Sequence, residues 1–313
     1  MSGYPNRTAL FVRQQPGGMF TVENVAEHPG NIFFVGSAVA GAADSVGAGR
    51  NPDNPFATLD YAIGQCTASQ GDVIYVLPGH NEGLGNAQIA VDVAGISIIG
   101  LGSGGLVPRI DFDHANASID VSASNVKIKN LRLLPSITTI AIGIDVMAGV
   151  TDTVLEDIEI LPGEDGAGAD EFVLGIDIKA GCTRTVVRRF KCRMHASVAH
   201  ANAGISLSGA SDDVLIEACD IQLIGAAGVA PIKGITTLST NVHIKGCTLV
   251  SDNEPGIELL TGTTGVISDN DIFSDLAAIA AAIVADGCAL FRNEYVEVGN
   301  ESNARIGAAS ADD

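Results

Sequence analysis

Residues 214–223 read VLIEACDIQL, and residues 242–250 read VHIKGCTLV. In both stretches aliphatic residues alternate with polar ones, the alternation breaks for two positions, and it resumes from a cysteine. Alternation with a period of two is typical of a β-strand that has one buried face. The break therefore predicts a corner, with one short strand before it and another after it.

The same frame recurs along the chain, for example as VKIKNLRLL at 126–134 and as GVISDNDIF at 265–273. Another phrase, Gly-Ile-x-aliphatic, precedes most copies of this frame, and its aliphatic anchors recur every 22 to 32 residues. A unit of this length cannot bury its own apolar stripe, so the units must stack on one another. Stacking in register places like residues next to each other, Cys219 with Cys247 and Asn270 with Asn293.

The repeat predicts an all-β fold, a single-stranded parallel β-helix of about eight to nine coils. We expect four segments, which are an extended N-terminal arm (1–30), a capping region with the first coil (31–82), the β-helix (83–300) and a polar C-terminal tail (301–313). Apolar residues at helical spacing follow Pro55 and stop near Gly64. This spacing predicts a short helix over 58–63 that covers the open end of the stack.

The chain has 313 residues and a net charge of -20. A chain this acidic is unsuited to wrapping a nucleic-acid backbone or to docking on anionic lipid. It has no apolar run of the length that crosses a membrane, and its first residues lack the apolar core of a secretory signal. None of its six cysteines lies in a CxxC pair, so we expect buried free thiols, with no bound metal or other cofactor.

The frames quoted above resemble the right-handed parallel β-helix repeat of the pectate-lyase-like superfamily. Residues 51–82, NPDNPFATLDYAIGQCTASQGDVIYVLPGHNE, resemble the opening of the phage branch of that superfamily, where a short helix caps the first coil. The resemblance to phage β-helices implies side-by-side association as a homotrimer. Four small or apolar residues are candidate contacts between protomers if they face outward: Ala226, Ala227, Val229 and Ala230.

Enzymes with this fold commonly act on polysaccharides, which requires an acidic cluster with an Arg or Lys on the same face, or paired carboxylates. The candidates are Asp212 with Asp213, and the acidic loop at 164–171. The companion motifs Asn-Thr-Asp, Gly-His-Gly and Arg-Ile-Lys are absent. We therefore interpret the first as an exposed corner and the second as a solvated turn. We expect no catalytic residues; an enzyme with this sequence would be a polysaccharide lyase or a glycoside hydrolase.

Five basic residues crowd one short stretch, and we call them the basic cluster: Arg184, Arg188, Arg189, Lys191 and Arg193. They either contact an anion or acidic partner, or pair with acidic neighbours on adjacent coils, and the sequence leaves both open. Nearby Cys192, His195 and His200 match no zinc spacing. His80, alone in a turn, is interpreted as structural.

The arm mixes aromatic and basic residues, and we expect a partner to bind through Tyr4, Arg7, Phe11, Arg13 and Phe20. Docking of the arm on its own acidic body is the alternative. We expect a non-enzymatic structural protein of a tailed-phage virion, a decoration or accessory protein on the capsid surface that is made in the host cytoplasm. Its partners would be the major capsid protein or other virion subunits. The alternatives are a tailspike or tail-fibre module that binds or cleaves host polysaccharide, and a cellular polysaccharide lyase or epimerase, which the missing export signal disfavours.

Overall fold

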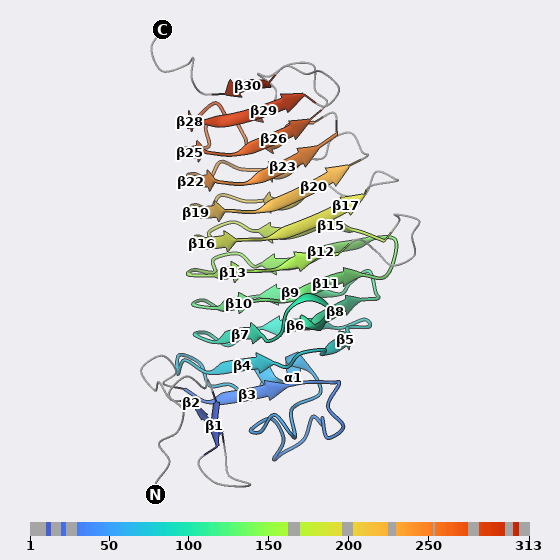
Figure 1. Ribbon diagram of the computed structural model, residues 1–313. Coiled ribbons are helices and arrows are strands. Elements are labelled where there is room, and N and C mark those ends of the chain that lie inside the picture. The colour runs from blue at the N-terminus through green and yellow to red at the C-terminus, as the bar shows by residue number, and fades with distance from the viewer. Residues whose placement is uncertain are drawn as a thin grey trace, which may run out of the picture.

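The computed structural model describes residues 11–13, 20–22, 30–161, 170–195, 203–224, 230–252, 254–274, 282–297 and 303–306. Its strands form a stack of coils, each of which adds one strand to each of three parallel sheets (Figure 1). Eight complete triplets run from β4–β5–β6 to β25–β26–β27, and β28 and β29 begin another. The expected parallel β-helix is confirmed.

Sheet 1 consists of β3 (Ile32–Val35), β4 (Val73–Val76), β7 (Ser97–Gly100), β10 (Lys127–Lys129), β13 (Val154–Glu156), β16 (Thr183–Arg188), β19 (Asp212–Glu217), β22 (Thr240–Lys245), β25 (Gly265–Ser268) and β28 (Cys288–Phe291). Sheet 2 consists of β5 (Asn81–Gly83), β8 (Arg109–Phe112), β11 (Arg132–Pro135), β14 (Glu159–Ile160), β17 (Lys191–His195), β20 (Asp220–Ile224), β23 (Thr248–Ser251), β26 (Asp271–Ser274), β29 (Asn293–Glu297) and β30 (Asn303–Ile306). Sheet 3 consists of β6 (Gln88–Val91), β9 (Ser118–Val121), β12 (Ile140–Val146), β15 (Phe172–Ile178), β18 (Ala203–Leu207), β21 (Ala230–Gly234), β24 (Ile257–Glu258) and β27 (Ile283–Val284).

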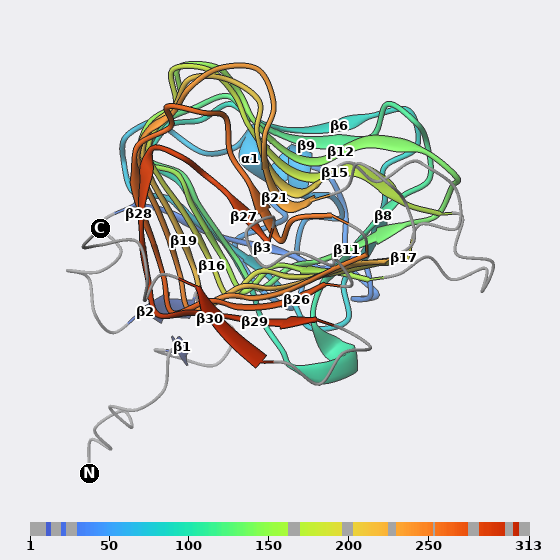
Figure 2. The ribbon, with the colours of Figure 1, turned by 90° about the horizontal axis from the view of Figure 1, so that it is seen from above.

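The two-residue break in the repeat is the corner between sheet 1 and sheet 2, seen end-on in Figure 2. One residue of each break adopts a positive φ, which lets the chain turn sharply between two strands. These residues are Asn130, Asp157, Arg189, Ala218, Gly246, Asp269 and Arg292. The next residue points inward and is buried, as Leu131, Ile158 and Phe190 are. The Gly-Ile-x-aliphatic phrase forms the strands of sheet 3.

Further along the same corner, the inward residues are polar, and the expected ladders are confirmed. Cys219 and Cys247 are buried free thiols in neighbouring coils. Asn270 and Asn293 follow them and are fully buried. Asn270 donates from Nδ2 to the carbonyl of Ile244 at 3.1 Å and accepts from the backbone N of Cys247 at 2.9 Å. The asparagine side chains therefore satisfy backbone groups that the turn leaves open.

The first end of the stack is closed by helix α1 (Leu59–Ile63), as the sequence predicted. Thr58 caps the helix by accepting a hydrogen bond from the backbone N of Tyr61 at 3.4 Å. Leu59 and Ile63 are buried against the core, and Asp60 accepts from the backbone N of Ala90 in β6 at 2.9 Å. The one 3₁₀ turn among the described residues, η1, spans Gly104–Leu106. No described helix has the length and apolar character needed to cross a membrane.

Two parts of the chain run antiparallel to their neighbours. In the N-terminal arm, β1 (Phe11–Arg13) pairs with β2 (Phe20–Val22), so these parts of the predicted extended arm form a two-stranded ribbon. At the other end, β30 pairs antiparallel with β29.

Ala230 corrects one expectation. It lies in β21 and is fully buried inside its own chain, so it is not available for contact with another protomer. Its inward position follows from the alternation of the strand. Ala226, Ala227 and Val229 lie outside the described residues.

Candidate functional site

The basic cluster lies on β16, β17 and the corner between them, and its arginines pair with carboxylates of neighbouring coils. The four ion pairs are Arg184–Asp152 (2.6 Å), Arg188–Glu217 (2.8 Å), Arg189–Asp157 (2.6 Å) and Arg193–Asp220 (3.6 Å). The sequence left two interpretations of the basic cluster open, and the structure supports pairing of its arginines with acidic residues of adjacent coils. Lys191 makes no ion pair with the part of the chain that the structure describes.

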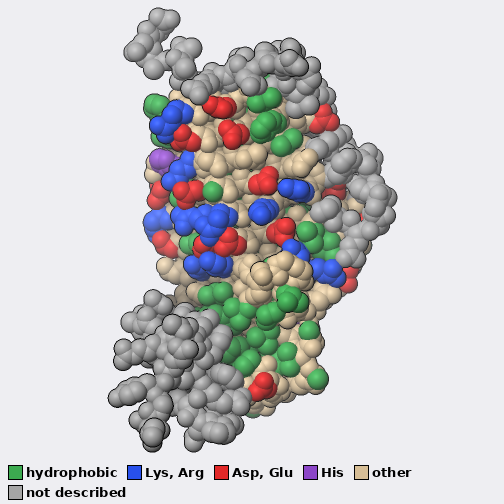
Figure 3. Space-filling view, viewed as in Figure 1, with side chains coloured by type: hydrophobic (Ala, Val, Ile, Leu, Met, Phe, Trp, Pro, Cys, Tyr) green, Lys and Arg blue, Asp and Glu red, His purple; other side chains and the backbone are tan. Residues whose placement is uncertain are grey.

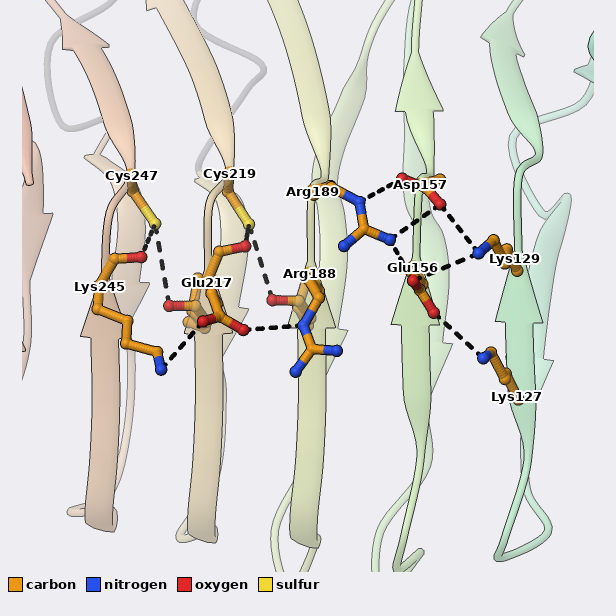
Figure 4. A network of polar contacts seen from close by, with 12 residues as sticks. Lys127, Lys129, Glu156, Asp157, Arg188, Arg189, Glu217, Cys219, Lys245 and Cys247 are labelled. Carbon is orange, nitrogen blue, oxygen red and sulfur yellow. Dashed lines mark hydrogen bonds and ion pairs between the residues drawn. The ribbon is translucent and has the colours of Figure 1, made fainter. Parts of the chain in front are cut away.

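Glu156 is the centre of a larger network (Figure 4). It is buried on the outer face of sheet 1, and it accepts from Arg189 and pairs with Lys127 at 3.2 Å and Lys129 at 3.4 Å. Burial raises the pKa of Glu156, but the hydrogen bonds from Arg189 and Lys127 outweigh it, so the pKa falls to about 2. The carboxylate thus stays ionised and holds three cations from two neighbouring coils.

The network continues across sheet 1 because one outward column alternates in charge. The strand register places Lys129, Glu156, Arg188, Glu217 and Lys245 side by side in five successive coils. Glu217 bridges its neighbours, 2.8 Å from Arg188 and 3.0 Å from Lys245. In Figure 3 the charged side chains gather over these middle coils. Ion pairs between side chains thus link neighbouring coils along the stack, in addition to the backbone hydrogen bonds between their strands.

A groove of about 690 Å³ lies beside this network, where η1 overhangs the corner between sheet 1 and sheet 2. Arg132, Arg189 and Lys191 line it together with the carboxylates of Asp157, Glu159 and Asp220. Arg132 is held by Glu159 at 2.6 Å, and Arg189 by Asp157. Lys191 is therefore the cation best placed to meet an anionic group of a ligand.

A second cleft, of about 580 Å³, lies on the outer face of sheet 3. Asp120, Asp145 and Lys179 line it. Asp120 and Asp145 belong to a carboxylate ladder, defined as Asp120, Asp145 and Asp177, which are in register on β9, β12 and β15, although Asp177 itself does not line the cleft. Asp145 is 5% exposed and Asp177 is 3% exposed. Lys179 donates to Oδ2 of Asp145, whereas Oδ1 of Asp145 and Oδ1 of Asp177 are buried without a hydrogen-bond partner.

Within the ladder, Asp145 interacts most closely with Lys179. Burial raises the pKa of Asp145, and the hydrogen bond from Lys179 opposes this rise only in part. Burial also lowers the pKa of Lys179, but its contact with Asp145 outweighs burial, so the lysine stays protonated. Buried hydrogen-bond acceptors without partners are rare in folded proteins, so each one calls for an explanation. The lysine that lines the cleft is held protonated, so it is not poised to remove a proton.

The ladder was not among the sites expected from the sequence, although the sequence carries a signal for it. Aspartate occupies the x position of the Gly-Ile-x-aliphatic phrase in Gly143–Val146 and Gly175–Ile178, and the weaker copy at 119–121 also carries it. The x positions face outward, where side chains of a strand are ordinarily solvated. The structure instead buries two of the three aspartates.

The acidic residues singled out from the sequence have structural roles or lie outside the description. Asp212 and Asp213 are exposed at the start of β19, as expected of a corner, and accept hydrogen bonds from Thr240 (2.5 Å) and Asn241 (3.2 Å) of the next coil. Of the acidic loop, only Asp170 and Glu171 are described. Glu171 is buried with no hydrogen-bond partner for either carboxyl oxygen, and burial raises its pKa to about 7.

The histidine and cysteine candidates for a metal site are only partly described. Across the described ranges, no three His, Cys, Asp or Glu side chains are grouped so as to hold a metal ion. Cys192 is buried in the core, only the backbone of His195 is described, and His200 lies outside the description. His80 is buried, accepts from the backbone N of Ser37 at Nδ1 (3.0 Å), and so donates from Nε2 to Glu82 (3.1 Å). The structural interpretation of His80 is confirmed.

Of the arm residues, Phe11, Arg13 and Phe20 belong to β1 and β2, and only their backbone is described. Tyr4 and Arg7 lie outside the described residues. The predicted role of the arm in partner binding stays a prediction.

Comparison with known proteins places this geometry in context. No model of a protein family matches the chain, and no curated protein does. Among solved structures, a rhamnogalacturonan lyase matches with a TM-score of 0.58 and 14% identity, over 78% of this chain and 69% of that one. The likeness is one of fold. The parallel β-helix that the resemblance to pectate-lyase-like proteins implied is thus confirmed.

Two further structures match less closely. They are a GH136 lacto-N-biosidase from Eubacterium ramulus (TM-score 0.38, 10% identity, 85% of this chain and 67% of that one) and ORF18 of Geobacillus virus E2 (TM-score 0.38, 11% identity, 75% and 56%). At this TM-score neither carries an argument about the present chain.

Proposed function

We propose that the chain is a structural protein of a tailed-phage virion, a decoration or accessory protein of the capsid that is anchored through its N-terminal arm. One observation carries this proposal: the basic cluster, the most prominent candidate for ligand binding in the sequence, is used between coils. Four of its five members pair with carboxylates of the same chain. Arginines that are engaged with carboxylates of their own chain are less available to bind an anionic substrate.

The opening of the chain supports the same proposal. Residues 51–82 resemble the opening of phage β-helices, and α1 closes the first coil as that resemblance implies. The partners would be the major capsid protein or other virion subunits, and the protein would work as a homotrimer at the capsid surface. Analytical ultracentrifugation of the full chain tests the trimer, and a monomer at micromolar concentration counts against it.

The decisive experiment adds the purified, gold-labelled full chain to particles of a candidate phage that lack this protein. Electron microscopy should place the label on the capsid. Phe20→Asp, which puts a charge in the apolar part of the arm, should reduce occupancy, whereas Leu215→Asp on the outer face of sheet 1 should not. Label on the tail, or none on any particle, contradicts the decoration role.

A second candidate function is favoured by the cleft on sheet 3. A tailspike or tail-fibre module would bind host polysaccharide there, because the polar side chains that line the cleft, among them Asn116, Asp120 and Lys179, suit the hydroxyl groups of a sugar. A similar fold carries the name rhamnogalacturonan lyase. Lyase chemistry needs a base, and Lys179 is held protonated by Asp145. The cleft therefore favours binding over cleavage.

Saccharide assays separate the two candidates. The full chain is incubated with surface polysaccharides of candidate hosts, and reducing ends, unsaturated products and retention on immobilised polysaccharide are measured. Retention that Lys179→Met abolishes supports the tailspike, and turnover overturns the non-enzymatic role. If the chain shows no retention and no turnover, the result favours the decoration protein.

A further inference from the structure

A set of hydrophobic side chains lies on the outside of the β-helix, separate from its core. We call it the outer patch, and its members are Ile32, Phe34, Val73, Tyr75, Leu77, Ile99 and Leu101. They come from β3, β4, β7 and the turns that follow these strands. The alternate residues Phe33, Ile74 and Ile98 belong to the core, so the patch faces away from it.

The patch ends abruptly along the stack. In one outward column, the register places Phe34, Tyr75 and Ile99 next to one another, and the next residue in the same column is Lys129. From Lys129 onward the column carries the alternating charges of Figure 4. In Figure 3 hydrophobic side chains are also visible at the surface below the charged coils. The outer face of sheet 1 is therefore apolar at β3, β4 and β7 and becomes charged from β10 onward.

The patch is covered. Phe34 and Tyr75 are each 2% exposed, and their rings stack with centroids 6.1 Å apart. A single sheet cannot bury aromatic rings on its own outer face, because the neighbouring side chains stand beside the rings and not over them. Within the described ranges, no hydrophobic side chain from another element packs against the patch. A hydrophobic cover for the patch must therefore come from outside the described elements.

The N-terminal arm is the segment best placed to supply this cover. It leads directly into β3, and in Figures 1 and 2 the ribbon of β1 and β2 lies outside the stack beside the first strands of sheet 1. The arm contains Phe11, Val12, Phe20 and Val22. Because it is tethered next to the patch, its effective concentration there is about millimolar, far above that of a second copy in solution.

We propose that the outer patch is the docking surface for residues 1–29 of the same chain, which fold back and cover it. The arm and the patch are then two halves of one apolar contact. A partner that draws the arm away uncovers both halves at once. This inference rests on the patch and concerns the same arm that the proposed function uses as its anchor. To bind a virion partner, the arm would have to leave the patch.

Limited trypsin digestion of the full chain tests the proposal, because Arg7 and Arg13 are the only Lys or Arg residues before Arg50. Ile99→Asp places a charge in the patch and should accelerate cleavage after Arg13 by at least about tenfold. Leu215→Asp is the matched control, since Leu215 is a half-buried outward residue of the same sheet in the charged coils. It should leave the rate unchanged.

Phe20→Ser provides a second variant in which the β-helix is untouched. It should accelerate the same cleavage while the circular dichroism of the β-helix stays that of the wild type. The proposal is overturned if neither Ile99→Asp nor Phe20→Ser changes the cleavage rate. It is also overturned if Ile99→Asp dissociates an oligomer while the arm remains protected, because the occupant of the patch is then a second copy.

Discussion

Asn270 and Asn293 occupy the same corner position in successive coils, and Nδ2 of Asn270 donates to Oδ1 of Asn293 at 2.9 Å inside the core. Nδ2 of Asn293 in turn donates to the carbonyl of Ile267 at 2.9 Å. Leu131 and Ile158 hold the same position in earlier coils without such bonds. The corner therefore accepts either an apolar side chain or a fully paired amide.

This relationship predicts non-additive substitutions. Asn293→Leu leaves the Nδ2 of Asn270 buried with one partner lost and should cost about 2–3 kcal/mol of unfolding free energy. Asn270→Leu combined with Asn293→Leu should cost less than the sum of the single changes, because both amides are removed together. Chemical denaturation of the four proteins measures the coupling, and additive costs would show that the ladder is not a unit.

The thiol pair should be inert in the folded chain. The contact with Cys247, together with burial, raises the pKa of Cys219. Cys247→Asp buries a charge without a partner and should destabilise by at least about 3 kcal/mol, whereas Cys247→Ser should cost far less. Labelling of both thiols should follow global unfolding, so rapid labelling under native conditions contradicts the assignment.

Glu156 should contribute stability that acid removes. Its pKa is about 2 in the folded chain and near 4.5 when unfolded, so its contribution is present above pH 4.5 and disappears as the pH falls toward 2. Glu156→Gln should cost about 1–2 kcal/mol at neutral pH, after allowance for the exposed ends of its partners, and little near pH 2. Asp269→Asn, which breaks the exposed pair with Arg292, is the control and should change little. Equal effects of the two substitutions would contradict a central role for Glu156.

Glu171 should change the pH dependence of stability in the direction opposite to Glu156. Burial raises its pKa from 4.5 to about 7, so the unfolded chain ionises first and stability falls as the pH rises from 4.5 to 7. Glu171→Gln should therefore stabilise the chain by up to about 3 kcal/mol near pH 8 and have little effect near pH 4. Melting curves at the two pH values measure this difference. A stabilisation that is independent of pH would point to packing instead of charge.

Lys179 should contribute to the stability of the folded chain, because its ammonium group pairs with the buried carboxylate of Asp145. Lys179→Met leaves that carboxylate without its cation and should cost about 2 kcal/mol or more at neutral pH. Asp145→Asn in the same chain should recover most of the loss, and so should a pH low enough to protonate Asp145. Lys245→Met, at a more exposed ion pair, is the matched control. Failure of Asp145→Asn to rescue would show that Lys179 acts through something other than this charge.

The sequence carried the fold because its repeat is local. The alternation, the two-residue break and the positions of Cys219, Cys247, Asn270 and Asn293 are all read from a single unit compared with the next. Pairings such as Arg188 with Glu217 depend on which residues become neighbours across coils of unequal length, so the sequence left them open. The burial of Asp145 was missed for a different reason, since outward positions of a strand are ordinarily solvated.

The reversal of β30 bears on how such a molecule ends. A parallel β-helix is in principle an endless polymer, because each coil offers the next one an identical template of unpaired backbone groups. Another copy arriving at the last coil finds, in sheet 2, a strand that runs the wrong way for parallel pairing. With α1 covering the opposite end, both described ends of the stack are less open to head-to-tail growth into fibres.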